Sequence, residues 1–396
     1  MSGEWKKVKL GDLVEINKSS IGRDFPFDEI EYIDTSSVTQ NNFEKPQILS
    51  LLTAPSRAKR LVKKNDIIIS TVRPIQRHYG FMKDVKPNTV VSTGFAVVTG
   101  IKINSLFLFY FLTQDLVTEY LDKIAESSTT TFPAFRPEIL SDLELDLPPL
   151  STQQKIAEIL SSLDDKIELN RQTNATLEAM AQTLFKEWFV APITEEDKIR
   201  LSDVIDIKHG YAFKGEFFSE TPTNDILVTP GNFKIGGGFN YSKFKYYNGE
   251  YPNSYILNKG EVIVTMTDLS KDGDSLGYAA ITPQIISHNL LHNQRIGRIV
   301  FKNGYNMPFF ISYLMRQSDY RNFVLGSATG TTVRHTSPNR ICEFAFSLPN
   351  QGKIAEFEKI ANELYELEIK NQQENQTLQH LRDSLLPRLM KGELLF

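Results

Sequence analysis

The sequence holds a single cysteine, Cys342, among 396 residues. One thiol cannot form an internal disulfide, so we expect a fold stabilised by its core and a reducing, cytoplasmic setting. The chain also lacks any apolar run near the roughly 20 residues that a membrane-spanning helix needs. Its first residues, MSGEWKKVKL, lack the apolar segment of a signal peptide. We therefore expect a cytoplasmic protein that has no membrane partner.

The common signatures of catalysis are missing as well. The sequence has no phosphate-binding G-x-x-x-x-G-K, no G-x-G-x-x-G, and no Asn/Asp-Pro-Pro-Tyr of the kind that amino-methyltransferases use. A G-x-S-x-G match at Gly273–Gly277 lies between a polar loop and a strand, whereas a nucleophile elbow needs a strand and then a helix. His288 and His292 are spaced like zinc ligands but have no acid or cysteine nearby. We expect no catalysis, no metal and no cofactor in this chain.

What the sequence does contain is an imperfect tandem repeat. NRQTNATLEAMAQTLF, from Asn170, returns as NQQENQTLQHLRDSLL, from Asn371. VKLGDLVEI, from Val8, returns as IRLSDVIDI, from Ile199, and a Thr-rich segment before a Leu-Pro closes the first part of each half. Such similarity at a fixed offset indicates a duplicated unit. A chain of this length also exceeds one ordinary core.

Each half reads as a β-rich segment followed by a long helix. Short β-branched runs bounded by Gly, Asn and Pro predict strands, and amphipathic segments from Ser105 and Met307 predict one helix within each β-rich part. We predict an α+β fold in which two globular β-rich domains are separated by a two-helix antiparallel coiled coil, with a pseudo-two-fold internal repeat. The predicted boundaries are 1–147 and 196–349 for the domains, and 148–195 and 350–396 for the helices.

The long helices carry a heptad seam, because their apolar residues recur at alternating spacings of four and three. Asparagines in the middle of a seam specify register, since they are satisfied only opposite another polar group. Two antiparallel helices of about 39 residues, each about 58 Å long at 1.5 Å per residue, would form a spacer. The alternative is solvent-facing asparagines on unrelated helices. The predicted seam residues are Leu163, Ile167, Asn170, Asn174, Leu177, Leu184, Leu364, Leu367, Asn371, Asn375, Leu378 and Leu385.

Basic residues are concentrated outside the long helices, although the net charge is −4. Residues 57–86 contain nine basic and two acidic residues, and residues 275–342 contain seven basic residues and one acidic residue. Such runs suggest a surface for DNA phosphates, and the alternative is a solvated face with locally paired arginines. Arginine can pair with guanine, and asparagine or glutamine with adenine. The candidate DNA-binding residues are Arg57, Arg60, Arg73, Gln76, Arg77, His78, Thr130, Arg136, Asn289, Asn293, Arg295, Thr331, Arg334 and His335.

Three segments of the chain match a known family. They are LPPLSTQQKIAEILSSLDDKIELNRQTNATLEAMAQTLFKEWFV, from Leu147, DIKHGYAFKG, from Asp206, and the tail LRDSLLPRLMKGELLF. Through them the chain resembles the DNA-specificity subunits of type I restriction-modification enzymes. It implies that two target-recognition domains each read one half of a split site in double-stranded DNA, and that the helices set the distance between the halves. It also implies that the helical regions dock two modification (methyltransferase) subunits, with S-adenosylmethionine bound there, and that restriction (translocase and endonuclease) subunits join them.

We expect partner subunits to contact the faces near Phe185, Trp188 and Phe189. The second helix departs from the family pattern, since it lacks the preceding Pro-Pro and has three more residues before its asparagine. Two other functions stay open, namely an autonomous methyltransferase or hydrolase and a protein scaffold that does not touch DNA. If each domain reads its own half-site, Arg77→Ala and Arg334→Ala should weaken different half-sites.

Overall fold

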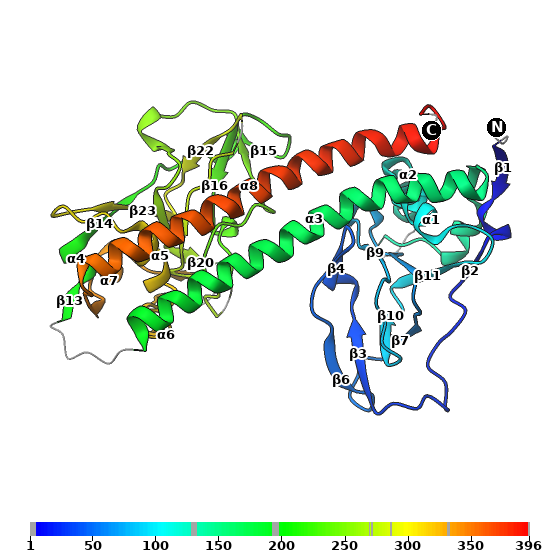
Figure 1. Ribbon diagram of the computed structural model, residues 1–396, viewed down its shortest axis with the longest axis horizontal. Coiled ribbons are helices and arrows are strands. Elements are labelled where there is room, and N and C mark those ends of the chain that lie inside the picture. Colours follow the sequence, from blue (N-terminus) through cyan, green and yellow to red (C-terminus); the bar gives the residue numbers. More distant parts are fainter. Residues whose placement is uncertain are drawn as a thin grey trace. The chain divides into compact units, whose positions relative to one another are not determined.

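The structure is a computed structural model that describes residues 5–127, 133–191, 198–268, 270, 272–285, 287–330 and 333–394. The chain divides into two compact units. The first unit comprises Met1–Leu169 and Glu374–Phe396, and the second unit comprises Asn170–Gln373. The long helices α3 (Leu150–Phe185) and α8 (Gln351–Met390) each contribute one part to each unit (Figure 1).

The first unit folds its β-rich part into two four-stranded sheets and two strand pairs. Its strands are β1 (Lys6–Lys9), β2 (Val14–Ile16), β3 (Glu29–Ile33), β4 (Val38–Thr39), β5 (Asn42–Phe43), β6 (Gln47–Ser50), β7 (Ala58–Leu61), β8 (Ile67–Ser70), β9 (Tyr79–Phe81), β10 (Thr89–Ser92), β11 (Phe95–Gly100) and β12 (Glu144–Leu147). The sheet orders are β2-β11-β8-β9 and β6-β3-β10-β7, and the pairs are β1-β12 and β4-β5.

The second unit has a four-stranded sheet, a five-stranded sheet and two strand pairs. Its strands are β13 (Lys198–Arg200), β14 (Ile205–His209), β15 (Phe218–Ser219), β16 (Asp225–Val228), β17 (Tyr246–Tyr247), β18 (Ile256–Leu257), β19 (Val262–Thr265), β20 (Thr267–Asp268), β21 (Ala279–Ile281), β22 (Asn289–His292), β23 (Ile296–Phe301), β24 (Arg334–His335) and β25 (Ala345–Ser347). The sheet orders are β14-β23-β19-β21 and β15-β17-β16-β22-β18, with pairs β13-β25 and β20-β24.

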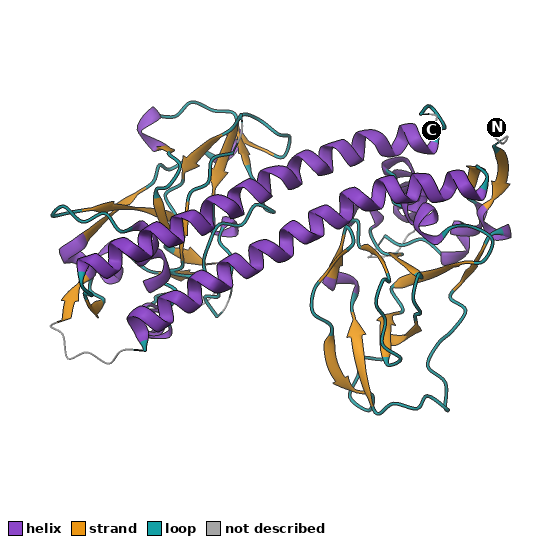
Figure 2. Cartoon of the chain, viewed as in Figure 1, coloured by secondary structure: helices purple, strands orange, loops and turns teal. Residues whose placement is uncertain are grey.

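The two units repeat one topology. The sheet β2-β11-β8-β9 corresponds to β14-β23-β19-β21. The other sheet of each unit contains one parallel pair, β3 with β10 and β16 with β22. The first strand of each unit, β1 or β13, pairs with the strand that precedes the next long helix, β12 or β25. The predicted α+β fold with an internal duplication is therefore confirmed, and Figure 2 shows strands and helices combined in each unit.

Short helices cover the sheets. They are α1 (Ser105–Leu112) and α2 (Asp115–Glu126) in the first unit, and α4 (Leu201–Val204), α5 (Pro308–Leu314), α6 (Ser318–Gly326) and α7 (Pro338–Cys342) in the second. The sequence of α1, SLFLFYFL, is apolar on every side, as is typical of a helix that is buried all round. Asn104 caps this helix by accepting a hydrogen bond from the backbone N–H of Phe107 at 3.0 Å.

Within each unit the local parts of α3 and α8 run antiparallel and complete the core. In the first unit, Ile156 and Leu160 of α3 and Leu389 of α8 are buried in one apolar cluster. In the second unit, Phe185 of α3 and Phe357 of α8 are buried in another, and their rings lie 5.5 Å apart. The long helices are thus part of each domain core, in addition to pairing with one another.

Glu358 of α8 covers the N-terminal end of α5. Its carboxylate accepts hydrogen bonds from the backbone N–H groups of Phe309 at 3.2 Å and Phe310 at 2.6 Å, so it satisfies two donors that a helix leaves open. Burial raises the pKa of Glu358 to about 7. The carboxyl group is therefore more easily protonated in the folded chain than in the unfolded chain.

We expect the stability of Glu358→Gln relative to the wild type to increase as the pH rises. The unfolded carboxyl group has an ordinary pKa of 4.5. Between that pH and about 7 the folded state binds the extra proton, so folding weakens as the pH rises. At pH 8 the penalty is at most about 3 kcal/mol, and glutamine does not carry it. Thermal unfolding of both proteins at pH 5 and pH 8 measures the effect, and a Tm difference that does not change with pH would contradict it.

Candidate DNA interface and helix pair

In the first unit, the loop that follows β8 lies beside the end of the Thr-rich segment. The backbone N–H of Phe135 donates to the carbonyl of Thr71 at 3.0 Å, and the N–H of Arg73 donates to the carbonyl of Pro133 at 2.9 Å. On its other side, the N–H of Thr71 donates to the carbonyl of Gly94 at 2.8 Å. We call residues 71–78 the first arginine loop. It brings the exposed side chains of Arg73 and Gln76 close to the segment that carries exposed Arg136.

Three other predicted residues of the first unit are held or enclosed locally. Arg57 forms an ion pair with Asp34 at 2.5 Å. The Nδ1 atom of His78 is hydrogen-bonded to the carbonyl of Val38 at 2.7 Å, which leaves only its Nε2 for an external partner. The Nε of Arg60 is buried and has no hydrogen-bond partner among the residues that the structure describes. These surroundings make Arg57 and His78 weaker candidates for base contacts than the exposed residues of the first arginine loop.

The second unit repeats this junction. The N–H of Met266 donates to the carbonyl of Arg295 at 3.0 Å, and the N–H of Thr336 donates to the carbonyl of Met266 at 3.0 Å. These bonds match those that Thr71 makes in the first unit. The short strands β20 and β24 pair here, with Asp268 opposite Arg334. The duplicated fold therefore brings the same three segments together twice, with different side chains.

Most of the predicted residues of the second unit gather at this junction. Arg295 and His335 are exposed, and the Nδ1 of His335 lies 3.3 Å from the hydroxyl of Thr267. Asn293 is only 8% exposed, and its side-chain oxygen accepts the N–H of Arg295 at 2.9 Å. Asn293 therefore shapes the turn that presents Arg295, so its predicted role in base contact needs to be corrected.

Asn289 lies apart from this junction, and its predicted contact with DNA stays a prediction. It lies at the other end of β22 from Asn293, and its amide donates to Asp225 at 2.8 Å. A strand rises about 3.3 Å per residue, so Asn289 is separated from the junction by the length of β22. Thr130 and Thr331, also predicted to contact DNA, lie outside the residues that the structure describes.

The helix pair of the first unit is closed by charged groups as well as by apolar ones. Asp164 of α3 accepts a hydrogen bond from the hydroxyl of Tyr110 at 2.7 Å and forms an ion pair with Arg382 of α8 at 2.7 Å. Lys166 and Glu374 form a further ion pair at 3.2 Å. The predicted seam residues of this unit are buried or half-buried, namely Leu163, Ile167, Asn375, Leu378 and Leu385.

The helix pair of the second unit contains the predicted asparagine contact. The amide of Asn371 donates to the side-chain oxygen of Asn174 at 2.8 Å, and the amide of Asn174 lies 3.3 Å from the carbonyl of Glu368. The prediction that asparagines face each other across a seam is confirmed in this unit. The predicted seam residues Asn170, Leu177, Leu184 and Leu364 are also buried or half-buried.

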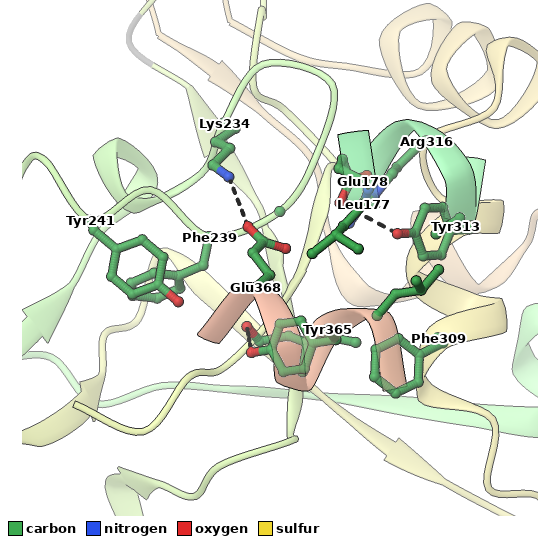
Figure 3. A pocket seen from close by; sticks show the side chains of 14 residues that line it. Leu177, Glu178, Lys234, Phe239, Tyr241, Phe309, Tyr313, Arg316, Tyr365 and Glu368 are labelled. Carbon is green, nitrogen blue, oxygen red and sulfur yellow. Dashed lines mark hydrogen bonds and ion pairs between the residues drawn. The ribbon is translucent and has the colours of Figure 1, made fainter. Parts of the chain in front are cut away.

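Leu367 does not belong to the seam, because it is 50% exposed. The adjacent residue, Glu368, takes the inward position and forms an ion pair with Lys234 at 3.5 Å. Burial raises the pKa of Glu368. Figure 3 shows Glu368 directed toward Lys234, with Tyr241 and Tyr365 beside it.

A second polar contact joins α5, and the turn that follows it, to α3 in the same pocket. Arg316 forms an ion pair with Glu178, and the hydroxyl of Tyr313 donates to Glu178 at 3.3 Å (Figure 3). The guanidinium of Arg316 lies over the Tyr313 ring, 4.2 Å from its centre. Tyr110 of α1 and Tyr313 of α5 occupy equivalent helices, and each donates to a carboxylate of α3. The β-rich part of each unit is therefore attached to its helix pair by a tyrosine.

The predicted partner contact through Phe185 is wrong for this side chain. Phe185 is 1% exposed and lies in the core of the second unit, and Trp188 and Phe189 pack against the same core. These three aromatics stabilise the junction of α3 with α5 and α8. The apolar side chains that the long helices and the following turn expose are Leu150, Leu169, Met180, Val190, Leu367 and Leu381.

The residues that matched catalytic and metal-binding patterns have local structural contacts. The hydroxyl of Ser275, in the G-x-S-x-G match, donates to Asp268 at 2.7 Å, and the match lies between strands β20 and β21. His292 is buried on β22, with its Nε2 bonded to the carbonyl of Ile296 at 2.8 Å. In the described part of the chain, no group of three or more His, Cys, Asp or Glu could hold a metal, and no helix is long and apolar enough to cross a membrane.

Comparisons with known proteins agree with the resemblance seen in the sequence. A family model described as "Type I restriction modification DNA specificity domain" matches residues 2–179 and 194–380. The chain is 28% identical to the type I restriction enzyme HindI specificity subunit of Haemophilus influenzae, over 99% of this chain and 100% of that protein. It is 24% identical to the MjaIX specificity subunit of Methanocaldococcus jannaschii, over 99% of this chain and 94% of that protein. The solved structure of a type I restriction-modification S subunit from M. genitalium shares the fold, with a TM-score of 0.57, 15% identity, and coverage of 98% of this chain and 96% of that one.

Proposed function

The chain belongs to the family of type I restriction modification DNA specificity domains, and from this premise we propose that it reads a DNA site in two parts, one with each unit. The role of this family is DNA recognition within a type I restriction-modification system, and the chain is a specificity subunit, not the enzyme of the complex. The observation that carries the two-part proposal is the duplicated junction. In both units equivalent backbone hydrogen bonds gather three segments, which together carry exposed Arg73 and Arg136 in the first unit and exposed Arg295 in the second.

The chemistry of the junctions supports contact with duplex DNA. Exposed Arg73 and Arg136 in the first unit, and exposed Arg295 in the second, can contact phosphates or pair with guanine in the major groove. The surrounding side chains differ between the units, so the two half-sites should differ in sequence. The asparagine contact supports a further proposal, that the helix pair fixes the number of bases between the half-sites. The bond between Asn371 and Asn174 is made in only one register of the two helices.

The proposal is tested with the chain produced together with its methyltransferase subunits. Mapping the methylated bases in DNA exposed to this complex should give a motif with two specified parts separated by unspecified bases. A single continuous motif would contradict recognition by two units, and binding without sequence preference would favour the scaffold alternative. The chain alone, incubated with S-adenosylmethionine, should transfer no methyl group, and detectable transfer would favour the autonomous enzyme.

We also propose that two modification subunits dock on the long helices, bind the S-adenosylmethionine themselves, and are joined by restriction subunits in a cytoplasmic complex. Support comes from the large apolar side chains that these helices leave exposed, since the fully buried centre of a protein interface is more apolar than the rest of the surface. Leu169 of α3 is 56% exposed, and Leu367 of α8 is 50% exposed. These positions replace Phe185 as candidates for partner contact.

Leu367→Glu is expected to weaken assembly with the methyltransferase subunits by about tenfold or more, because burying a leucine contributes about 1.5–3 kcal/mol and a buried, unpaired carboxylate opposes binding. Co-purification of the complex at graded concentrations measures this. Glu366→Gln, a change at an adjacent exposed position, serves as the matched control. If Leu367→Glu assembles as the wild type does, α8 does not dock a partner through this face.

A further inference from the structure

In each unit, a short helix lies beneath a loop of the DNA-facing junction. In the first unit, α2 contacts the 3-10 turn Pro74–Gln76 of the first arginine loop. In the second unit, α6 contacts the turn 272–277, which follows β20. The helices α2 and α6 hold the same place in the repeat, since each follows the tyrosine-bearing helix of its unit. Equivalent helices of the two units therefore contact two loops that differ in sequence.

In the first unit, the support comes from carboxylates. Asp122 accepts a hydrogen bond from the backbone N–H of Ile75 at 3.1 Å, and Asp115 forms an ion pair with Arg77 at 2.8 Å. Residues seven apart lie on the same face of a helix, so both carboxylates point to the same loop. Asp115 is 71% exposed, so its ion pair contributes little. Asp122, which is half-buried and bonded to the backbone, is the stronger of the two contacts.

The first arginine loop needs such support because of its backbone. Arg73 has φ 45° and Arg77 has φ 57°, both in the left-handed region. A residue other than glycine costs about 1–2 kcal/mol in that region. Ile75, at the top of the turn, is 53% exposed, so its side chain does not anchor the loop in the core. The Ile75 side chain is not packed in the core, so the hydrogen bond from the Ile75 N–H to Asp122 is what fixes this part of the turn.

In the second unit, the support comes from a guanidinium. Arg321 of α6 is 8% exposed, and its Nη2 donates to the carbonyl of Gly273 at 3.0 Å. Its guanidinium lies over the ring of Tyr278, 3.9 Å from the ring centre, on the other side of the same turn. Gly273 has φ +70° and Gly277 has φ +77°, which a glycine adopts without strain. The backbone carbonyl of Gly273 in this turn is directed toward α6, and the guanidinium of Arg321 on α6 donates a hydrogen bond to it.

We propose that Asp122, assisted by Asp115, and Arg321 are positioning residues that fix the geometry of the recognition loop above them and so determine how well each unit discriminates its half-site. The inference rests on the proposed function. In the first unit, the N–H of Ile75 and the guanidinium of Arg77 in the loop bind carboxylates of α2. In the second unit, the carbonyl of Gly273 in the loop binds the guanidinium of Arg321 on α6. Loop and helix form a matched pair, so a loop transferred between units without its helix should lose its discrimination.

The test uses the chain in complex with its methyltransferase subunits, and duplexes that carry the mapped site or one base-pair change in either half. Asp122→Ala, which removes the oxygen that accepts the Ile75 N–H, should lower discrimination at one half-site by about tenfold, as expected for loss of a hydrogen bond to a charged group. Asp115→Asn should have a smaller effect at the same half-site. Arg321→Met should lower discrimination at the other half-site, and Arg321→Lys, which can still donate to the Gly273 carbonyl, should restore part of it.

Matched controls separate positioning from general destabilisation. Tyr120→Gln on α2, which lies on a different face from Asp115 and Asp122, and Asn322→Ala on α6 change exposed residues of the same helices and should leave discrimination within about twofold of the wild type. Equal loss at both half-sites, or unchanged discrimination in Asp122→Ala and Arg321→Met, would overturn the positioning proposal. A wild-type complex that discriminates at neither half-site would instead overturn the proposed function, so the two failures are distinguishable.

Discussion

Replacing Phe185 with alanine is expected to lower the stability of the second unit by about 3–5 kcal/mol, the usual cost of removing a buried aromatic side chain. Phe185 is 1% exposed. Its ring lies 5.5 Å from the rings of Phe310 and Phe357, and 5.3 Å from that of Phe189. These neighbours come from α5, from α8 and from the π-helical turn Lys186–Val190. A cavity at this position removes contacts among all of them, because surrounding side chains fill such a gap only in part.

Backbone hydrogen exchange, followed by mass spectrometry, measures this loss within each unit. In Phe185→Ala, protection should fall in β19 and β23 of the second unit, whereas β8 and β11 of the first unit report on an independent core. Phe218→Ala is the matched control, because Phe218 is 44% exposed and its loss should cost about 1 kcal/mol, well below the cost at Phe185. Wild-type protection of β19 and β23 in Phe185→Ala would contradict the role assigned to this ring.

The helix seam shows both the strength and the limit of an apolar pattern. The buried stripe of α8 runs through Phe357, Ala361, Leu364, Glu368 and Asn371, with spacings of four and three. The asparagine contact was predictable because polar residues in a seam need a polar partner. The inward position of Glu368 was not predictable, because a charged residue was not expected to face inward. It is explained by the ion pair with Lys234, which lies 134 positions away in the sequence.

The sequence indicated which segments form the loop junctions, but it did not indicate how these segments lie relative to one another. Basic runs and Thr-rich segments marked the segments that meet at the two junctions, and the repeat indicated that both halves would bring them together alike. Their adjacency depends on non-local hydrogen bonds, such as that between Phe135 and Thr71, which no local pattern encodes. For the same reason Asn289 and Asn293, four positions apart in the sequence, are separated by the length of strand β22. The supporting residues Asp122 and Arg321 gave no signal, since single charges on short helices are common.

Arg136→Ala and Arg295→Ala are expected to weaken binding of the assembled complex to DNA at different half-sites, each by about 10- to 100-fold, the effect of losing one specific arginine contact of about 1–3 kcal/mol. Both side chains are exposed, and they come from different units.

Competition binding at fixed salt, with duplexes altered in one half-site at a time, separates the two effects. An arginine that reads a base should lose discrimination only at its own half-site, whereas one that contacts a phosphate should weaken binding to all sequences alike and reduce the salt dependence. Arg388→Ala, a change at an exposed residue of α8, is the charge-matched control. Loss of discrimination at both half-sites in either single variant would mean that the two units do not read DNA separately, and the duplicated junction would then need another explanation.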